Sequence, residues 1–323
     1  MKEIKIGILG AGFMAKMHLE SYKLIDGAKV SCVYKQTADE EFAKKYGVKL
    51  YTDIDKMLDE NEFDVIDICL PSFMHVNSAL KAMDKCRYLF LEKPVALTDI
   101  ECDKLLAKQK QSGCKVQVGH VLRFEQEYLY LKNAIQNNTF GKVSNATFRR
   151  LSPSPGWGKG WQCDISKSGG ALVDLFIHDA DMMLWLFGNP CKSQSITNSI
   201  GEKLSYVSVL CKYPEFVVSL EGSWQFPTTF PFSAYFRVVF ENAVVEYKDG
   251  SLTVYDSKSS YKPELPKKVQ ASVDVGGNIS DLGGYYNELE YFINAVKNKE
   301  DITKCTLIDG ANALKYVLNL KNN

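Results

Sequence analysis

Residues 4–15 read Ile-Lys-Ile-Gly-Ile-Leu-Gly-Ala-Gly-Phe-Met-Ala, and this stretch decides the fold of the first part of the chain. Ile4–Leu9 is a short apolar run typical of a strand, and Gly10–Ala15 follows it in the pattern GxGxxA before a helical segment. In such a turn the two glycines allow a tight bend and a close approach of a pyrophosphate, and the helix N-terminus stabilises the phosphate charge. The pattern predicts a dinucleotide-binding turn, with an ordinary glycine turn as the alternative.

Strand-like and helix-like segments alternate over the first 120 residues. The short runs rich in Val, Ile, Leu and Phe are Ile4–Leu9, Lys29–Val33, Asp64–Leu70, Arg87–Leu91 and Lys115–Val118. Longer amphipathic segments separate them, such as Ser72–Lys85 and Thr98–Ser112. Alternation of this kind predicts βαβ units. We therefore expect an α/β fold in which residues 1–121 form a Rossmann domain with a doubly wound parallel sheet.

The pattern changes after about residue 121. Helical segments are expected at Glu125–Gln136, Ala171–Phe187, Leu282–Lys297 and Thr306–Leu320. The segment Lys142–Leu151 leads to an irregular stretch, Ser152–Gly170. From Ser193 to Tyr255 the sequence is strand-like, with period-two runs such as Tyr206–Cys211, Val217–Trp224 and Ala234–Phe240. Period-two runs are typical of a sheet with one covered face. Residues 122–323 are thus predicted to form an α+β domain with a large, mostly antiparallel open sheet.

Composition narrows the class of protein. The chain has 323 residues, which favours two domains. Lys+Arg and Asp+Glu both number 39, so net charge gives no reason to expect nucleic-acid or anionic-membrane binding. No apolar stretch approaches the roughly 20 residues that span a bilayer. Because Met1-Lys2-Glu3 runs directly into a strand-like segment, we expect no signal peptide and a cytoplasmic protein.

The cysteines indicate neither a disulfide framework nor a metal site. Nine are scattered along the chain, and Cys32 and Cys69 lie inside apolar runs. No CxxC, HExxH or His-rich tract is present. We expect reduced core thiols and no metal.

The end of the second predicted strand bears on the choice of dinucleotide. A carboxylate there binds the ribose hydroxyls of NAD, whereas a cation favours the 2′-phosphate of NADP. The chain reads Val-Tyr-Lys-Gln-Thr over residues 33–37, with no carboxylate until Asp39. Lys35 is a candidate ligand of the 2′-phosphate and Tyr34 a candidate neighbour of the adenine. The alternative is a solvated loop lysine, so NADP is favoured slightly over NAD.

Lys93 is the first candidate catalytic residue. It lies in Leu-Glu-Lys-Pro-Val, residues 91–95, at the carboxyl end of a predicted parallel strand, where open α/β sheets bind ligands. Pro94 restricts the backbone of Lys93 and so fixes where its side chain begins. A lysine there can polarise a substrate hydroxyl, although a Glu-Lys pair is more often an exposed ion pair.

Asp174, His178 and Asp181 form a second candidate cluster. They are spaced i, i+4 and i+7, so an α-helix would place them on one face of an otherwise apolar segment. Carboxylates and an imidazole in such surroundings need partners. An imidazole suits proton transfer near neutral pH. The alternatives are a catalytic site, which the chain's count of only four histidines favours, and a buried structural network.

Together these motifs resemble the glucose–fructose oxidoreductase/inositol dehydrogenase family. The resemblance rests on Gly10–Ala15, on Glu92-Lys93-Pro94 and on the Gly169–Asp181 block, and it extends to Pro71-Ser72…His75 and Tyr285…Glu288…Phe292. It implies an NAD(P)-dependent oxidoreductase that transfers a hydride between nicotinamide and a hydroxyl-bearing carbon of a sugar, cyclitol or similar polyol. It also implies a homodimer or homotetramer built through the open sheet.

The resemblance assigns roles to individual residues. Lys93 would lie between nicotinamide and substrate, Asp174 and His178 would handle the proton, and Asp181 would bind substrate hydroxyls. The residues implied to bind the dinucleotide are Gly10, Gly12, Phe13, Met14, Pro71, His75 and Glu92. Tyr34 replaces an Asp that is frequent in the family, which favours NADP.

Three questions stay open in the sequence. Trp157 and Trp161 either stack on a sugar or anchor their own irregular loop, and Arg123 lies near the expected domain junction as a candidate substrate contact. A hydrolase of the same fold that borrows a hydride, or a dinucleotide-binding regulator without turnover, are alternatives to a dehydrogenase.

Overall fold

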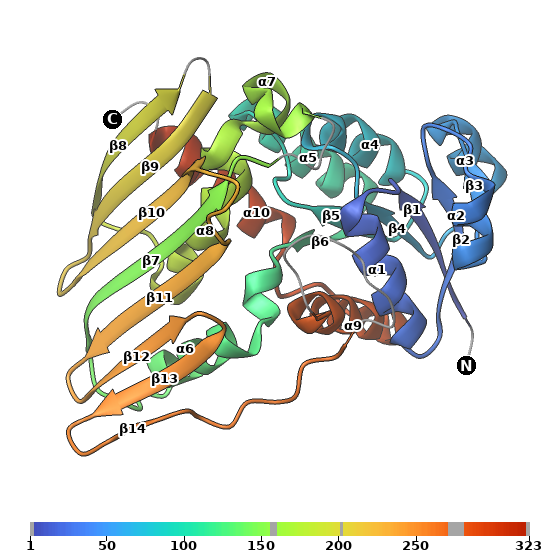
Figure 1. Ribbon diagram of the computed structural model, residues 1–323. Helices are drawn as coiled ribbons and strands as arrows, with labels where there is room; N and C mark the ends of the chain where they lie inside the picture. Colours follow the sequence, from blue (N-terminus) through green and yellow to red (C-terminus); the bar gives the residue numbers. More distant parts are fainter. Residues whose placement is uncertain (1–2, 156–159, 201–202, 271–280, 321–323) are drawn as a thin grey trace. The chain divides into compact units, whose positions relative to one another are not determined.

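The computed structural model describes residues 3–155, 160–200, 203–270 and 281–320 (Figure 1). The chain divides into two compact units. The first comprises Met1–Phe124 with Lys268–Ala311, and the second comprises Glu125–Lys267 with Asn312–Asn323. The sequence division at residues 121 and 122 stays a prediction, and the compact units differ from it because residues 268–311 return to the first unit.

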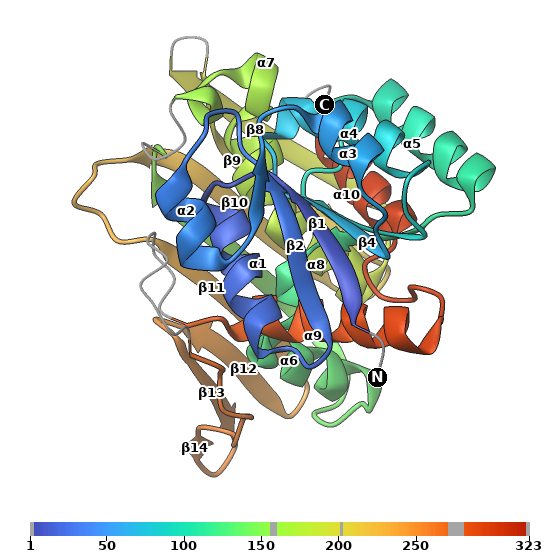
Figure 2. The same ribbon diagram turned by 90° about the vertical axis from the view of Figure 1, so that its right-hand side faces the viewer.

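The first unit is built on a six-stranded sheet, and its parallel, doubly wound character is confirmed. The strand order is β3-β2-β1-β4-β5-β6, and every neighbouring pair is parallel. Figure 2 shows β1 between β2 and β4. The strands are β1 (Ile4–Leu9), β2 (Ala28–Tyr34), β3 (Lys49–Tyr51), β4 (Val65–Ile68), β5 (Tyr88–Glu92) and β6 (Lys115–Gly119).

Helices cover both faces of this sheet. Figure 1 shows α1 and α9 on one side and α4 and α5 on the other. The predicted helix over Ser72–Lys85 begins as a 3₁₀ turn and continues as α4. The helical elements of the unit are α1 (Phe13–Leu24), α2 (Glu40–Tyr46), α3 (Ile54–Glu60), η1 (Ser72–Met74), α4 (His75–Ala82), α5 (Asp99–Ser112), η2 (Val121–Phe124) and α9 (Gly283–Asn298).

The core explains why α9 belongs to this unit. Leu289, Phe292 and Ile293 of α9 are buried in one cluster with Ile6 and Phe90 of the sheet. The rings of Phe90 and Phe292 meet edge to face, with centroids 5.5 Å apart. The apolar face of a C-terminal helix thus completes the core of an N-terminal sheet.

The second unit contains an eight-stranded, mostly antiparallel sheet, as the period-two runs predicted. Its order is β14-β13-β12-β11-β7-β10-β9-β8, and only β7 and β10 pair in parallel. The strands are β7 (Val143–Pro153), β8 (Lys192–Ile200), β9 (Lys203–Lys212), β10 (Val217–Phe226), β11 (Ser233–Phe240), β12 (Ala243–Lys248), β13 (Ser251–Asp256) and β14 (Ser260–Tyr261).

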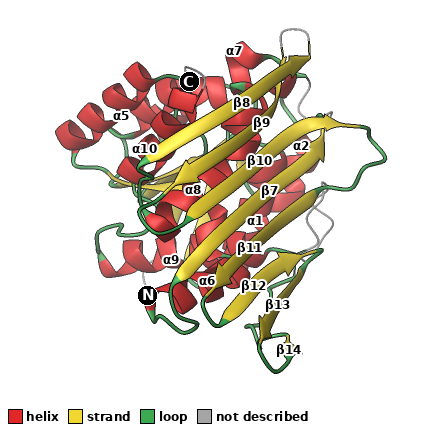
Figure 3. Ribbon diagram, turned by 90° about the vertical axis from the view of Figure 1, so that its left-hand side faces the viewer, coloured by secondary structure: helices red, strands yellow, loops and turns green. Residues whose placement is uncertain are grey.

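One face of this sheet packs on helices and the other does not. Side chains that alternate with the buried ones include Leu210, Ser219 and Arg237, which are exposed or half-buried. Figure 3 views the sheet from this side, and no helix of the described chain lies in front of the strands. The helical elements of the unit are α6 (Gln126–Gln136), η3 (Trp161–Cys163), α7 (Ile165–Ser168), η4 (Leu172–Phe176), α8 (Ile177–Phe187) and α10 (Leu307–Asn319), the last of which begins in the first unit.

A buried ion pair joins α8 to the sheet. The Arg150 guanidinium on β7 donates from Nε and Nη2 to the two carboxylate oxygens of Asp179, over 3.0 and 3.1 Å. The same Nη2 also donates to the hydroxyl of Tyr128 over 3.3 Å. Burial raises the pKa of Asp179, and the guanidinium opposes that shift.

Arg150→Met should leave the Asp179 carboxylate buried without its partner. We expect the free energy of unfolding to fall by about 3–5 kcal/mol. Arg149→Met is the matched control, because Arg149 is half-buried and stacks on Tyr235; its effect should be about 1 kcal/mol or less. Denaturant unfolding of both variants tests this, and equal losses would contradict it.

Candidate functional site

The carboxyl ends of β1 and β4 mark the expected ligand position in the first unit. From this central pair the chain runs outward to β2 and β3 on one side and to β5 and β6 on the other. Open α/β sheets bind ligands where the strand order reverses in this way. Gly10 follows β1, Cys69 follows β4, and Lys93 follows β5.

Gly10 and Gly12 serve the turn after β1 in different ways. Gly10 has a φ of 121°, and a Cβ there would lie 2.5 Å from the carbonyl oxygen of Cys69. Only glycine fits this bend and close approach. Gly12 has an ordinary φ of −78°, and a Cβ there would find no heavy atom within 4 Å. Gly12 therefore keeps open the space beside the N-terminus of α1, as approach of a pyrophosphate requires.

The rest of the motif fits the same interpretation. Ala15 is fully buried and packs against the core of the sheet, so this small residue brings α1 close to β1. Phe13 and Met14 are half-buried in the first turn of α1 and pack near Leu282. The chain's own residues thus fit a bound dinucleotide.

Lys35 is held by a carboxylate. Its Nζ donates to Asp39 Oδ2 over 2.6 Å, and Asp39 Oδ1 accepts from the backbone N–H of Phe42 to cap α2. The hydrogen bond from Lys35 lowers the pKa of Asp39, and the nearby Lys16 adds to the effect. Lys35 is thus part of a half-buried ion pair with Asp39. Tyr34 is the last residue of β2 and is half-buried.

His75 joins the two loops that follow β4 and β5. Its Nδ1 lies 2.7 Å from the carbonyl oxygen of Pro94 and its Nε2 lies 2.7 Å from that of Leu70, next to Pro71. Only an imidazolium donates to both oxygens, because a neutral ring has one N–H. Burial lowers the pKa of His75, and the two carbonyl groups oppose that shift. The ring is 1% exposed, so it braces the loops rather than offering an open surface.

Glu92 is the last residue of β5, and Lys93 follows it. The Glu92 side chain is buried over Gly119 of β6, where a Cβ would lie 2.9 Å from the carboxyl carbon. Its Oε1 lies 3.2 Å from His18 Nε2. Lys93 is half-buried, and the peptide bond between Lys93 and Pro94 is cis.

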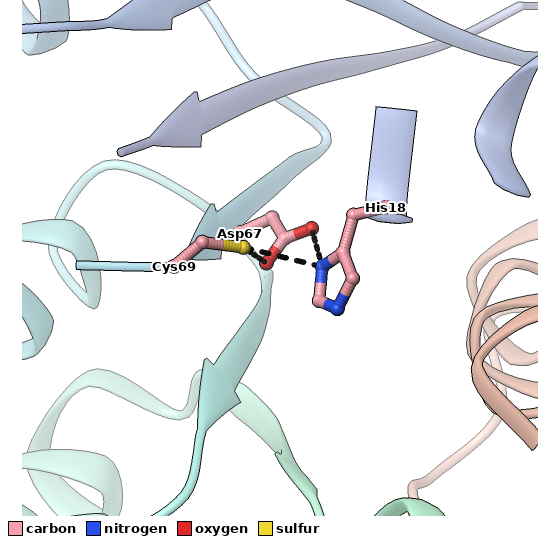
Figure 4. A group of neighbouring side chains, drawn as sticks. All are labelled: His18, Asp67 and Cys69. Atoms are coloured by element: carbon pink, nitrogen blue, oxygen red, sulfur yellow. Dashed lines mark hydrogen bonds and ion pairs between the residues drawn. The ribbon is translucent and has the colours of Figure 1, made fainter. Parts of the chain in front are cut away.

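His18 and Asp67 are buried polar residues that the sequence analysis did not single out. Figure 4 shows them with Cys69, and His18 Nδ1 lies 2.7 Å from Asp67 Oδ2. Asp67 stands inside the apolar strand Val65–Ile68. A carboxylate in such a strand needs a buried partner, and this was the signal available in the sequence. Cys32 and Cys69 are buried thiols, as predicted.

The predicted helical segment over Ala171–Phe187 is helical throughout, but its first part is not α-helical. Leu172–Phe176 is π-helical and α8 begins at Ile177. Phe176 in this segment packs closely against Gly222 of β10, where a Cβ would lie 2.9 Å from Phe176 Cβ. Asp174 therefore lies within a π turn, which is wider than the α-helical turn expected, and His178 follows it in α8.

The other predicted residues of the second unit differ in their burial. Asp174 and His178 are half-buried, and Asp181 is buried. Trp161 is half-buried at the start of η3, and Trp157 lies outside the described residues. In the first unit, Arg123 is buried, and its Nη1 lies 3.4 Å from Asp309 Oδ1.

Two sequence models of one family match the chain. The model described as "Oxidoreductase family, NAD-binding Rossmann fold" matches residues 4–120, and the GFO/IDH/MocA C-terminal domain matches residues 128–252. The two models cover both sheets in the order found here. The chain belongs to the GFO/IDH/MocA family of oxidoreductases.

Two curated relatives resemble part of this chain. A myo-inositol 2-dehydrogenase of Thermotoga maritima is 29% identical over 57% of this chain and 55% of its own. A glucose-6-phosphate 3-dehydrogenase of Bacillus subtilis is 30% identical over 62% of this chain and 57% of its own. The matched part of the chain thus spans about half the length of these curated relatives.

Solved structures support the fold. The structure of apo scyllo-inositol dehydrogenase from Lactobacillus casei superimposes with a TM-score of 0.79 at 22% identity, covering 99% of this chain and 96% of the other. Within the described ranges, no helix has both the length and the apolar character needed to cross a bilayer.

The two glycines of the turn should respond differently to substitution. Gly12→Ala should leave the free energy of unfolding within about 0.5 kcal/mol. It should weaken NADPH or NADH binding at least about tenfold, which corresponds to 1.4 kcal/mol. Gly10→Ala should instead lower the free energy of unfolding by about 1–3 kcal/mol at least, because of its φ and its contact with Cys69. Fluorescence titration and thermal unfolding measure the two effects. Unchanged dinucleotide binding by Gly12→Ala would contradict a pyrophosphate site at this turn.

Proposed function

We propose that this protein is an NAD(P)-dependent dehydrogenase or reductase acting on a CH–OH group of a sugar, cyclitol or similar small polyol. The observation that carries the proposal is the open space at Gly12, beside a helix N-terminus at the reversal of the parallel sheet. Membership of an oxidoreductase family supports the reaction class. The names of the inositol and glucose-6-phosphate relatives support the substrate class.

Each catalytic role is assigned to a side chain of suitable chemistry. A bound nicotinamide supplies the hydride acceptor or donor. In the oxidation direction, Lys93 stabilises the developing alkoxide. His178 takes the hydroxyl proton, and Asp174 favours the resulting imidazolium. Asp181 binds neighbouring substrate hydroxyls, while Arg123 and Trp161 are further candidate contacts.

A screen of polyols, sugars and sugar phosphates with both dinucleotides tests the reaction class. A change in NAD(P)H absorbance with a freely exchanging cofactor supports a dehydrogenase. Glycoside cleavage without net NAD(P)H change would favour the hydride-borrowing hydrolase, and dinucleotide binding without any turnover would favour a regulator.

The open sheet face is the proposed interface of a homodimer or homotetramer. Its central row contains Leu210, Ser219, Thr147 and Arg237 on adjacent strands. Ile196 is a further exposed apolar side chain, so apolar and polar groups are mixed on this face. A mixed surface of this kind suits a polar-rimmed contact between copies of the chain. The cytoplasmic location stays a prediction.

Substitution of the proposed catalytic residues should lower turnover without unfolding the protein. Lys93→Ala should lower kcat by ~10²-fold or more, with a smaller effect on dinucleotide affinity. For oxidation, kcat/KM should fall towards acid pH as the His178 imidazole becomes protonated, and His178→Gln should remove that dependence together with most activity. Melting temperatures measured beside the pH–rate profiles separate catalysis from folding. A folded and fully active His178→Gln protein would rule out the proposed base.

NADP(H) is the proposed preferred cofactor, with Lys35 as the ligand of its 2′-phosphate. Because Asp39 holds Lys35, Asp39→Asn should raise the preference for NADPH over NADH by about tenfold, the scale of one charge-assisted hydrogen bond. Asn retains the capping function of Asp39, so α2 should persist. Lys35→Ala should change the preference in the opposite direction. Titration with both dinucleotides checks this, and a Lys35→Ala protein with the wild-type ratio of affinities would contradict it.

A further inference from the structure

A buried polar cluster lies under the dinucleotide turn. His18 and Tyr22 come from α1, Asp67 from β4, Cys69 from the end of β4, and Glu92 from β5. The Tyr22 hydroxyl donates to Asp67 Oδ2 over 2.9 Å, the oxygen that also faces His18 Nδ1. The other ring nitrogen of His18 faces Glu92. One imidazole therefore bridges two carboxylates that belong to different strands.

The groups around His18 favour its charged form. Burial lowers the pKa of His18, but the Asp67 carboxylate and the Cys69 group outweigh burial and raise it well above its usual value. Further groups around the cluster are the Phe90 ring, which meets the imidazole edge to face, and Glu288 of α9, whose charge contributes to the raised pKa of Tyr22. An imidazolium supplies positive charge to both buried carboxylates. It bonds to Asp67, whereas Nε2 and Glu92 Oε1 form an ion pair at 3.2 Å without the geometry of a hydrogen bond.

Hydrogen bonding explains the cluster better than a metal ion does. His18 Nδ1, an Asp67 oxygen and Cys69 Sγ lie within 4.8 Å of one another, as metal ligands do. However, the 2.7 Å between Nδ1 and Oδ2 is shorter than the ~3.3 Å expected between two ligands of a tetrahedral zinc ion. Burial also raises the pKa of Cys69, which keeps the thiol protonated rather than metal-binding.

The cluster connects two parts of the proposed active site. α1 begins at Phe13, directly after the open space at Gly12, and His18 lies about 8 Å further along the helix axis. Glu92 is the residue before Lys93. A displacement of the His18 ring relative to Glu92 would therefore move the strand end that carries Lys93 relative to the dinucleotide turn.

We propose that His18, as an imidazolium, is a positioning residue that fixes Glu92, and with it Lys93, relative to the dinucleotide turn. Asp67 holds the first side of the ring, and Glu92 faces the second. The inference rests on the proposed function, because it assumes that Lys93 acts on the substrate.

Two amide variants separate the two sides of the ring. Asparagine at position 18 places its amide nitrogen where Nδ1 lies and so retains a donor to Asp67, whereas glutamine reaches the position of Nε2 and retains a donor to Glu92. His18→Asn should lower kcat by about tenfold to a hundredfold, the scale of a 1 Å misplacement, while NADPH affinity changes little. His18→Gln should keep kcat within about threefold of wild type, although both variants melt at lower temperature.

Tyr22→Phe is the matched control for stability. It removes a donor to the same Asp67 oxygen without affecting the contact with Glu92, so it should lower the melting temperature and leave kcat unchanged. A loss of kcat by Tyr22→Phe in proportion to its loss of stability, or equal kcat in His18→Asn and His18→Gln, would overturn the positioning role.

Two measurements need no substrate and distinguish this inference from the proposed function. In ¹⁵N-histidine NMR, His18 should remain an imidazolium from about pH 6 to pH 8, across the usual histidine pKa of about 6.5. The rate of acetylation of Lys93 by acetic anhydride, read by peptide mass spectrometry, should change in His18→Asn and not in His18→Gln. A neutral His18 at pH 8, or an unchanged Lys93 rate in His18→Asn, would overturn the inference whether or not a substrate is found. Absence of turnover with every polyol would instead count against the proposed function.

Discussion

The close approach of Gly10 to the carbonyl group of Cys69 is the constraint on which the first unit depends. It brings the ends of β1 and β4 together, where the strand order reverses. A side chain at position 10 would separate these ends, because a Cβ has no room beside the Cys69 backbone. The same bend leads into α1 three residues later and directs this helix over the strands. The buried contact between His18 and Asp67 depends on that direction, because the two residues come from α1 and β4.

In each unit, a buried ion pair connects the sheet to a helix that carries proposed functional residues. In the first unit His18 connects α1 to Asp67 and Glu92. In the second unit Asp179, next to His178, connects α8 to Arg150 of β7. Buried ion pairs contribute little to net stability, because desolvation offsets their attraction. They do oppose any shift of the helix that would leave a charge without its partner. In both units the ion pair therefore fixes the position of the helix more than it raises the free energy of unfolding.

Local sequence signals predicted the strands and the dinucleotide turn. The features that could not be predicted depend on contacts between residues that are distant in the sequence. Apolar runs and Gly10–Ala15 located β1 and α1, since both depend on neighbouring residues. The pairing of His18 with Asp67 spans 49 positions, so no local pattern contains it. The packing of Phe292 on Phe90 likewise assigns α9 to the first unit across about 200 residues. The π-helical turn at Leu172–Phe176 accompanies tight packing on Gly222, which the spacing of polar residues does not reveal.

Lys93 illustrates how these buried contacts combine around a single residue. The residue before it, Glu92, faces the imidazole of His18, and the residue after it, Pro94, faces the imidazole of His75. The two rings differ in their electrostatics, because the Asp67 carboxylate raises the pKa of His18 whereas burial lowers that of His75. One neighbour is therefore held by charge and the other by the contact between His75 Nδ1 and the Pro94 carbonyl oxygen, to which a neutral ring can donate. With the backbone held on both sides, the freedom that remains to Lys93 is mainly that of its own side chain. A lysine that must meet a developing alkoxide needs this arrangement, since electrostatic stabilisation depends on groups that are already in place.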